Sequence, residues 1–460
     1  MDVKDKKRKI RLNTMQLIAL GFFGVIFLGG ILLWLPWCNE QPIRFIDAMF
    51  TSVTAVCVTG LVTITPATQF TLLGKVILLI LIQIGGVGVI ACTIAFFVLL
   101  KKRITIRERA IIQQAYSMEN LSGMVKFILR IIKGTLVMEF IGGVLFALEF
   151  VPDFGWVRGI WYSVFHSISA FCNAGIDILG TDSMIHYQNS VPINIAIMGL
   201  IVFGGLGFVV WYDVGANIRR VISEHQPLRR MFTRLQLQSK VVLVMTATLI
   251  LIGAACFLGL EHNNPETMQG MSWGNKIMAS FFQSVTTRTA GFATISQDGL
   301  TSGSKLVGCI LMFIGGSPGG TAGGVKTTTV ALLLILSLSV IRGSNHTECF
   351  GRKIARDVVR TGTAIVLITF ITLMAGVVAI TILEPKEDFL RILYEATSAM
   401  ATVGLTADLT PQLCDASHVI LMIMMYIGRI GPITMALVFG GKGSSEKALR
   451  DLPEKRIMVG

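Results

Sequence analysis

The sequence has 460 residues, of which 53% are hydrophobic and only 15% are charged, and its mean hydropathy is +0.70. A water-soluble domain of this size could not bury so much apolar surface, so the composition excludes an ordinary soluble protein and indicates a membrane protein. The formal net charge of +13 comes from separated clusters of Lys and Arg, which argues against a nucleic-acid-binding protein. The clusters lie at residues 4–11, 101–109, 219–234, 342–360 and 442–456.

Several apolar runs qualify as membrane-spanning helices, because crossing the hydrocarbon takes about 20 residues. They occupy residues 15–37, 72–100, 127–150, 193–211, 241–260, 361–383 and 418–440. The first run is too long for a cleaved signal peptide and lacks a small-residue cleavage site, so we expect it to be a spanning helix. Basic and nearly charge-free connections alternate, which follows the positive-inside pattern and predicts that both termini are cytoplasmic.

A short polar segment that ends in glycine recurs four times. The copies are SVTAVCVTG ending at Gly60, SISAFCNAG at Gly175, SVTTRTAG at Gly291 and TSAMATVG at Gly404. The intervals between these glycines are 115, 116 and 113 residues. Self-similarity at a nearly fixed period indicates a repeated structural unit.

Each predicted unit consists of a long apolar helix, a short amphipathic stretch, the polar segment and a second apolar helix. The amphipathic stretches at 43–55, 161–171, 276–286 and 390–400 are too short to span and suit re-entrant helices. The predicted divisions are a basic N-terminal segment 1–13, units 14–105, 106–235, 236–345 and 346–441, and a cytoplasmic tail 442–460.

The polar segments have the composition of an ion filter. Irregular backbone at membrane depth is tolerated only where it is buried in protein or lines a wet cavity. Four copies around one axis would line a pore, and carbonyl oxygens without backbone donors could replace the hydration shell of a cation. Glycine permits positive φ, and the preceding Thr59, Asn173, Thr289 and Thr402 can bond neighbouring backbone. No carboxylate lies in the segments, which favours a monovalent cation. The alternative, ordinary turns with incidental glycines, is disfavoured by the constant spacing.

A glycine cluster follows each polar segment inside the second apolar helix: IGGVG (84–88), FGGLG (203–207), IGGSPGG (314–320) and IGRIG (427–431). Around the third cluster, residues 313–329 contain six glycines and a proline. Each interior glycine costs a helix about 1 kcal/mol and a proline about 3 kcal/mol, so this helix should be interrupted. We predict an intramembrane gate loop at 314–326; the alternative is a glycine-rich packing seam. Its candidate gating residues are Gly315, Gly316, Ser317, Pro318, Gly319, Gly320, Thr321, Gly323, Gly324 and Lys326.

Arg429 replaces the second glycine of the fourth cluster. A charge at the centre of the bilayer costs roughly 2.5–3.5 kcal/mol on insertion scales, so Arg429 should face the pore rather than lipid. There it would oppose cation passage by repulsion, or cap the loop carbonyls of the broken third helix, or do both. Lys326 could act similarly or extend toward the cytoplasm. Asp177, Asp298 and Asp408 follow three of the polar segments, either concentrating cations outside the pore or serving as ordinary solvated charges.

At these residues, above all SAFCNAG and TTRTAGF, the sequence resembles the Trk/Ktr/HKT superfamily of potassium transporters. The resemblance covers nearly the whole chain. It implies an all-α polytopic membrane protein with four tandem M1–pore helix–M2 units around one central pore, a pseudo-fourfold arrangement like a potassium channel. Trk-type proteins carry two extra N-terminal helices, so the nearer resemblance is to the bacterial Ktr membrane subunit, KtrB.

The resemblance further implies potassium uptake across the plasma membrane, with sodium dependence as a Ktr property, and neither enzymatic activity nor a covalent cofactor. Retention of glycine at position 60 implies potassium selectivity, because the plant branch with serine there favours sodium. The implied partners are a second copy of the chain, giving a homodimer, and a cytosolic KtrA-like regulatory subunit that binds ATP or ADP. The implied filter residues are Val58, Thr59, Gly60, Asn173, Ala174, Gly175, Thr289, Ala290, Gly291, Thr402, Val403 and Gly404.

Two alternatives stay open at this point. The first is a sodium-permeable or non-selective monovalent cation channel of the same superfamily. The second is a secondary transporter of an organic substrate, a class that usually shows inverted repeats rather than four units of one orientation.

Overall fold

The computed structural model describes residues 14–99, 124–180, 182–225, 227, 229–344, 346–431 and 435. In this part of the chain the regular structure is helical, apart from a short hairpin of β1 (Glu348–Cys349) and β2 (Arg352–Lys353). The predicted N-terminal segment 1–13, the basic connection 101–109 and the tail 442–460 fall outside the described residues, as do both termini.

Each repeat begins with a long apolar helix followed by a short one. The long helices are α1 (Thr14–Trp34), α7 (Met124–Phe154), α12 (Leu237–Glu261) and α16 (Arg356–Leu383). All four contain a stretch long and apolar enough to cross a membrane. The short helices are α2 (Phe45–Cys57), α8 (Trp156–Phe171), α13 (Trp273–Thr286) and α17 (Phe389–Ala401). They occupy the predicted amphipathic stretches.

The second helix of each repeat is broken or ends at its glycine cluster. The pieces are α4 (Leu72–Val87) and α5 (Val89–Leu99), α9 (Val191–Leu206) and α10 (Phe208–Ser223), α14 (Ser302–Phe313) and α15 (Thr327–Ile341), and α18 (Asp415–Ile430). Treating 72–100 and 193–211 as single spans is therefore wrong. Gly88, Gly207 and Gly431 have φ of 97°, 90° and 96°, which a right-handed helix cannot continue. At Gly207 the two pieces meet at 99°.

The remaining elements are short and lie in the connections. They are η1 (Pro36–Cys38), α3 (Pro66–Gln69), η2 (Ile185–Tyr187), α11 (Arg229–Arg234) and η3 (Thr410–Gln412).

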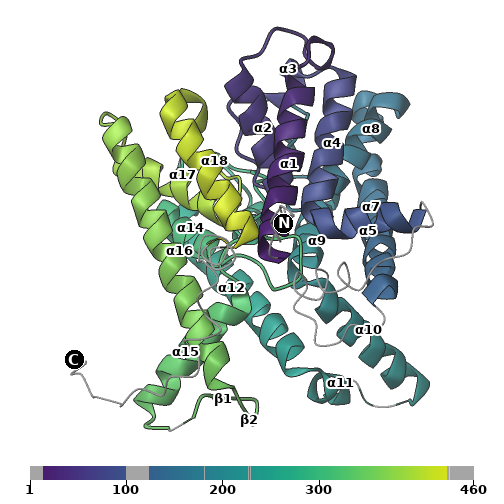
Figure 1. Cartoon of the computed structure of the whole chain (residues 1–460), viewed down its shortest axis with the longest axis vertical. Helices are drawn as coiled ribbons and strands as arrows, with labels where there is room; N and C mark the ends of the chain where they lie inside the picture. Colours follow the sequence, from purple (N-terminus) through teal and green to yellow (C-terminus); the bar gives the residue numbers. More distant parts are fainter. Residues whose placement is uncertain are drawn as a thin grey trace, which may run out of the picture.

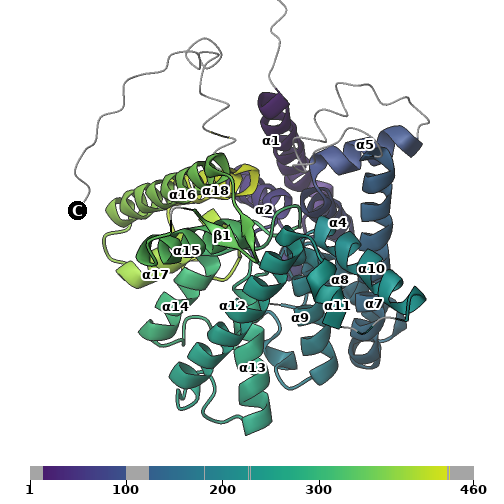
Figure 2. The ribbon, with the colours of Figure 1, turned by 90° about the horizontal axis from the view of Figure 1, so that it is seen from below.

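The four repeats form a closed ring. The second helix of each repeat packs against the short helix of the next one: α4 on α8, α9 on α13, and α14 on α17. α18 then packs on α2, so the last repeat contacts the first. Both ribbon views show this closure, with the yellow α18 beside the purple α1 and α2 (Figures 1 and 2).

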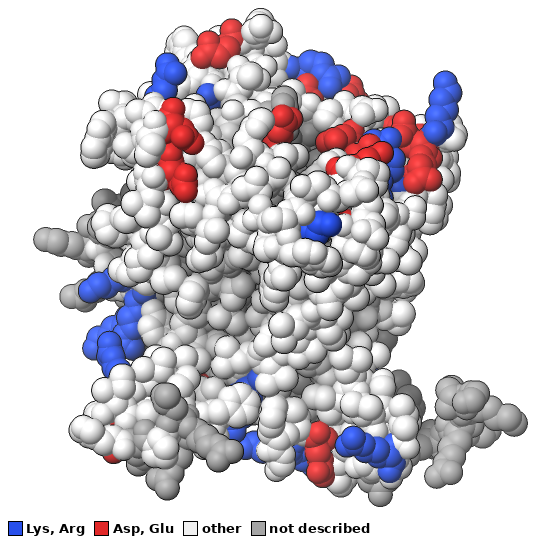
Figure 3. Space-filling model, turned by 180° about the vertical axis from the view of Figure 1, so that it is seen from behind, with Lys and Arg blue, Asp and Glu red and all other residues white. Residues whose placement is uncertain are grey.

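The surface is divided as a membrane protein requires. The space-filling view shows a broad belt almost free of charge, with Asp and Glu concentrated at the upper end and Lys and Arg prevailing at the lower end (Figure 3). The lower end carries α10, α11 and the β1–β2 hairpin (Figure 1). The positive-inside rule predicts that this basic end faces the cytoplasm.

Candidate functional site

The four polar segments adopt one backbone path. Each short helix is followed by a left-handed residue, and the glycine two positions later also has positive φ. The angles are 56° at Val58, 60° at Asn173, 67° at Thr289 and 52° at Thr402, and then 105° at Gly60, 62° at Gly175, 82° at Gly291 and 94° at Gly404. The first equivalent position is therefore Val58, and grouping Thr59 with Asn173, Thr289 and Thr402 is wrong by one residue. A left-handed β-branched residue is unfavourable by itself, so the surrounding packing imposes this turn.

The four glycines meet in a cycle. A Cβ added to any one of them would press on a backbone carbonyl of the neighbouring turn. In order, Gly60 faces Ala174 O, Gly175 faces Ala290 O, Gly291 faces Val403 O and Gly404 faces Thr59 O. The structure thus brings all four predicted filter segments together around one centre, at a spacing that only glycine permits.

The carbonyl groups of these turns have no hydrogen-bond donors. Within the described ranges, no donor bonds the carbonyl oxygen of any of the twelve predicted filter residues. All of the twelve are buried except Gly291, which is partly exposed. Buried carbonyls are nearly always paired, so a ring of unpaired oxygens is suited to coordinate a cation.

A hydroxyl side chain braces every turn from the end of its short helix. Thr54 Oγ1 accepts from Gly60 N at 2.9 Å, and Ser398 Oγ accepts from Gly404 N at 3.0 Å. In the other two turns the hydroxyl donates to the carbonyl after the glycine, from Ser169 to Ile176 (2.6 Å) and from Thr286 to Phe292 (2.5 Å). Sequence reasoning missed these four residues, although a Ser or Thr at the corresponding place in each copy was the available signal.

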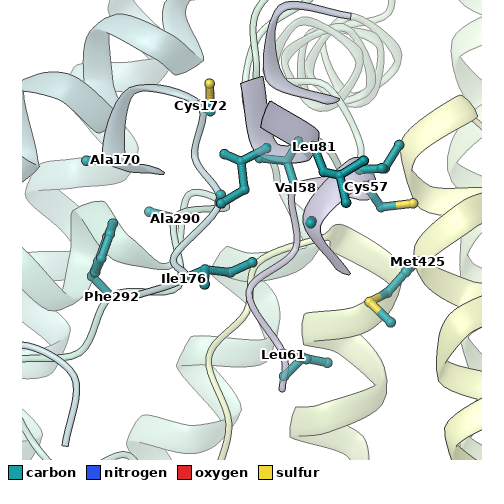
Figure 4. Packing of buried hydrophobic residues seen from close by; sticks show 14 of the residues in the cluster. Cys57, Val58, Leu61, Leu81, Ala170, Cys172, Ile176, Ala290, Phe292 and Met425 are labelled. Atoms are coloured by element: carbon teal, nitrogen blue, oxygen red, sulfur yellow. The ribbon is translucent and has the colours of Figure 1, made fainter. Parts of the chain in front are cut away.

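Apolar packing holds the turns from outside. The residue after each glycine is a buried hydrophobic: Leu61, Ile176, Phe292 and Leu405. Figure 4 shows three of these side chains within one cluster that also contains Leu81 of α4 and Met425 of α18. The turns are therefore fixed by a hydroxyl within their own repeat and by a core shared between repeats.

The glycine clusters allow the second helices to approach the short helices closely. In three repeats, a Cβ on the first glycine of the cluster would collide with a carbonyl at the end of the short helix of the same repeat. The pairs are Gly85 with Val56 O, Gly204 with Phe171 O and Gly428 with Met400 O. In the third repeat, Gly315 instead faces Gly323 O of the loop that interrupts the helix.

The predicted interruption at 314–326 is present between α14 and α15. The loop closes on itself: Gly316 N donates to Gly323 O at 3.3 Å, and Thr327 N donates to Gly316 O at 3.0 Å. The hydroxyls of Ser317 and Thr327 lie 2.8 Å apart in a buried hydrogen bond. A flexible-looking sequence is thus folded into a compact, internally bonded loop.

The loop lies directly against two of the four turns. Thr321 Oγ1 is 3.2 Å from Phe171 O and 3.3 Å from Asn173 Oδ1, at the second turn. Gly323 lies against Thr402 of the fourth turn, where an added Cβ would collide with the threonine hydroxyl. The loop therefore contacts the ring itself.

The bend at Gly207 supplies the docking site for the loop. Ser317 N donates to Gly205 O at 2.9 Å, and Thr321 N donates to Gly204 O at 3.1 Å. In return Phe208 N donates to Gly319 O at 3.0 Å. A helix end leaves carbonyls and amides without intrahelical partners, and here the loop pairs with them.

Arg429 ties the loop to the rest of the ring. From the last turn of α18, its guanidinium donates to Thr321 O in the loop and to Gly85 O in α4, and it reaches Gly86 O at 3.4 Å. The bond to Thr321 O is the contact that the capping interpretation requires, and it leaves the repulsion interpretation open. Lys326 folds back, with Nζ 2.8 Å from Ala322 O, and does not extend toward the cytoplasm.

Carboxylates surround the outer side of the ring, in loops outside the spanning helices. Burial raises the pKa of Asp177 to about 6. The pKa of Asp408 is also raised, by burial and then by the nearby charge of Asp298. Asp298 is itself paired with Arg391, at 3.2 Å. The outer loops therefore carry two carboxyl groups with raised pKa values and a third that is held in an ion pair.

Comparison with known proteins establishes the family. The family model TrkH, described as "Cation transport protein", matches residues 3–449. The chain belongs to this family. The predicted membership of the Trk/Ktr/HKT superfamily is thereby confirmed, and the family consists of cation transporters rather than enzymes.

Full-length relatives agree with this assignment. The chain is 38% identical to the potassium/sodium uptake protein NtpJ of Enterococcus hirae, over 100% of both chains. It is 34% identical to the Ktr system potassium uptake protein B of Bacillus subtilis, over 99% of each chain. Among solved structures, the potassium transporter TrkH from Vibrio parahaemolyticus matches with a TM-score of 0.73 at 16% identity, covering 94% of this chain and 86% of that one. That likeness shows the same fold.

Proposed function

We propose that this protein takes up potassium ions across the plasma membrane through a pore whose selectivity filter is the ring of four glycine turns. The observation that carries the proposal is the cycle of buried carbonyl oxygens without donors. Such oxygens can replace the water around a cation as it enters. The names of the relatives, which are potassium or potassium/sodium uptake proteins, support the same cargo.

The filter chemistry favours a monovalent ion. No Asp or Glu occupies any of the twelve filter positions, whereas calcium sites use several carboxylates. A sodium-permeable pore is the second candidate, because one relative is named as a potassium/sodium uptake protein. Sodium dependence of potassium uptake, which the Ktr resemblance implies, belongs to the proposal as well.

The loop 314–326 acts as the gate in this proposal. It is bonded to the second repeat, lies against two filter turns and is held by Arg429. We take this docked position as the closed state, with the positive charges of Arg429 and Lys326 adding repulsion below the filter. Opening then requires the loop to leave Gly204, Gly205 and the guanidinium.

Assembly follows the Ktr pattern in this proposal. A homodimer would sit on a cytosolic KtrA-like ring that binds ATP or ADP and moves the gate. The basic end of the molecule is the docking face in this proposal (Figure 3). The repeat boundaries remain those predicted from the sequence.

Ion flux into vesicles tests the function. Purified protein in liposomes should accumulate rubidium, a potassium substitute, faster than sodium under an inside-negative potential. In Gly291→Ser, the side chain would press on Val403 O at a φ of 82°, so the preference for rubidium should fall. An equal rubidium-to-sodium ratio in both proteins would contradict the filter assignment, and vesicles that pass neither ion with the gate loop shortened would contradict a pore.

A further inference from the structure

A cavity of about 770 Å³ lies between α7 and α10, next to the bend of the second repeat. Arg130 and Lys133 line it from α7, and Trp211, Tyr212 and Arg219 line it from α10. Small residues help to keep it open, because Gly134 of α7 and Gly215 of α10 have no side chains. The volume is in the range of small-molecule sites.

The cavity is strongly cationic. Within the described ranges, none of Arg130, Lys133 and Arg219 lies within ion-pair distance of a carboxylate. The acidic residue of α10, Asp213, is engaged elsewhere: its Oδ2 accepts from Gln236 N at 2.9 Å and its Oδ1 accepts from Asn217 at 3.1 Å. Three basic side chains that line one cavity favour an anionic ligand.

The basic cavity lies next to an apolar surface that would face lipid. From Leu136 onward, within one turn of Lys133, α7 presents exposed apolar side chains; Leu136 is 57% exposed and Phe140 is 73% exposed. In a membrane these side chains face acyl chains. Basic pockets between spanning helices on the cytoplasmic side are where anionic lipid headgroups bind.

We propose that the cavity binds the phosphate headgroup of an anionic glycerophospholipid from the cytoplasmic leaflet, with its acyl chains along the outer face of α7. A segment of this chain is a poor occupant: the adjoining residues 100–123 contain five Lys or Arg and two Glu, so they repel the site. A soluble phosphate compound shares the headgroup chemistry but does not use the apolar face of α7.

The bound lipid would contact the element that holds the loop. Trp211 packs edge-on against Phe208 at 5.4 Å and against Phe171 at 5.7 Å between ring centroids. Phe208 N is bonded to Gly319 of the loop, and Phe171 O accepts from Thr321. An effect of the lipid on ion flux rests on the proposed gating function, whereas the binding itself does not.

Native mass spectrometry of the purified full chain, titrated with phosphatidylglycerol or phosphatidylcholine, tests the binding without any transport measurement. The double variant Lys133→Gln/Arg219→Gln should weaken phosphatidylglycerol binding by about tenfold, since each basic residue adds to the electrostatic attraction of an anionic lipid. Lys126→Gln/Arg220→Gln removes one Lys and one Arg from the same two helices outside the cavity and should bind as the wild type does. Lys133→Arg should retain binding.

Three results would overturn the proposal. One is unchanged phosphatidylglycerol binding by the cavity variant, with size-exclusion chromatography showing intact protein. Another is equal weakening in the control variant, which would mean attraction to net charge alone. The third is displacement of the lipid by inorganic phosphate or ATP at micromolar concentration, which would assign the site to a soluble ligand.

Discussion

The four repeats are nearly identical at the level of the four glycine turns and unlike one another immediately beneath them. In the ring, every repeat provides the same two positive-φ residues and a bracing hydroxyl. One turn lower, the first helix breaks at Gly88, the second bends by 99° at Gly207, the third opens into a loop and the fourth carries Arg429. Symmetric coordination needs four equal contributors, whereas a gate needs one contributor that can move and others that hold it.

This contrast explains how one glycine pattern serves two purposes. In three repeats the first cluster glycine lets the helix approach the short helix, which stabilises the ring. In the second repeat the last glycine also bends the helix and exposes backbone groups that bind the loop. The same residue type thus gives close packing above and a docking site below.

The largest expected effect comes from breaking the symmetric region. In Gly175→Ala the added methyl would press on Ala290 O and Gly291 at a φ of 62°. Left-handed strain and overpacking together predict a fall in rubidium uptake of about a hundredfold. Gly180→Ala is the control, because, apart from its chain neighbours, no described residue has an atom within 4 Å of the added Cβ. Uptake within twofold of wild type in Gly175→Ala would mean that the turns do not line the ion path.

Weakening the contacts that hold the loop should raise ion uptake rather than lower it. Arg429→Gln removes charge-assisted bonds worth roughly 1.5–3 kcal/mol each, so uptake without a regulatory subunit should rise by about tenfold. Arg429→Lys separates the two roles, because lysine keeps the charge but cannot reproduce the planar fork. If Lys behaves like Gln, the bonds to Thr321 and Gly85 dominate; if it behaves like Arg, repulsion dominates. Slower uptake in a folded Arg429→Gln protein would refute the gate.

A smaller effect should come from the braces. Thr54→Val removes the hydroxyl that accepts from Gly60 N, a bond of about 0.5–1.5 kcal/mol, and should reduce the rubidium-to-sodium preference by up to about tenfold. Thr51→Val is the matched control, since among the described residues the Thr51 hydroxyl bonds only the carbonyl of Asp47, within its own helix. Competition between the two ions in flux assays measures the preference. Equal changes in both variants would show that helix packing, not the brace, is responsible.

The smallest expected effect concerns outer pH. A carboxyl group whose pKa is raised to about 6 is ionised above that pH and neutral below it, so Asp177 should lose its negative charge between pH 7.5 and 5.5. Uptake should then fall by less than about twofold, as the outer loops attract cations less strongly. Asp177→Asn should remove this part of the pH profile, while the exposed Glu266→Gln should leave it. An unchanged profile in Asp177→Asn would assign the dependence to other groups.

The fold class and the site could be predicted because both depend on local patterns repeated four times. Spacing of 113 to 116 residues located each turn, and the glycine and proline content of 313–329 located the loop. The one-residue error at Thr59 arose because residue types alone do not show which position adopts the left-handed backbone conformation. Continuity of the runs 72–100 and 193–211 was misjudged because hydropathy does not register a positive φ at Gly88 or Gly207.

The sequence by itself determined that this chain resides in a membrane, that it has four similar units, and that each unit contributes a glycine turn. Tertiary structure alone decided that the turns follow one another in a closed cycle, that the loop docks on the second repeat, and that Arg429 bonds both Thr321 and Gly85. The physical reason is the range of the interactions. Helix periodicity and glycine content act within a few residues, whereas the partners of Arg429 are 108 and 344 positions away in the chain and meet it only when the ring closes.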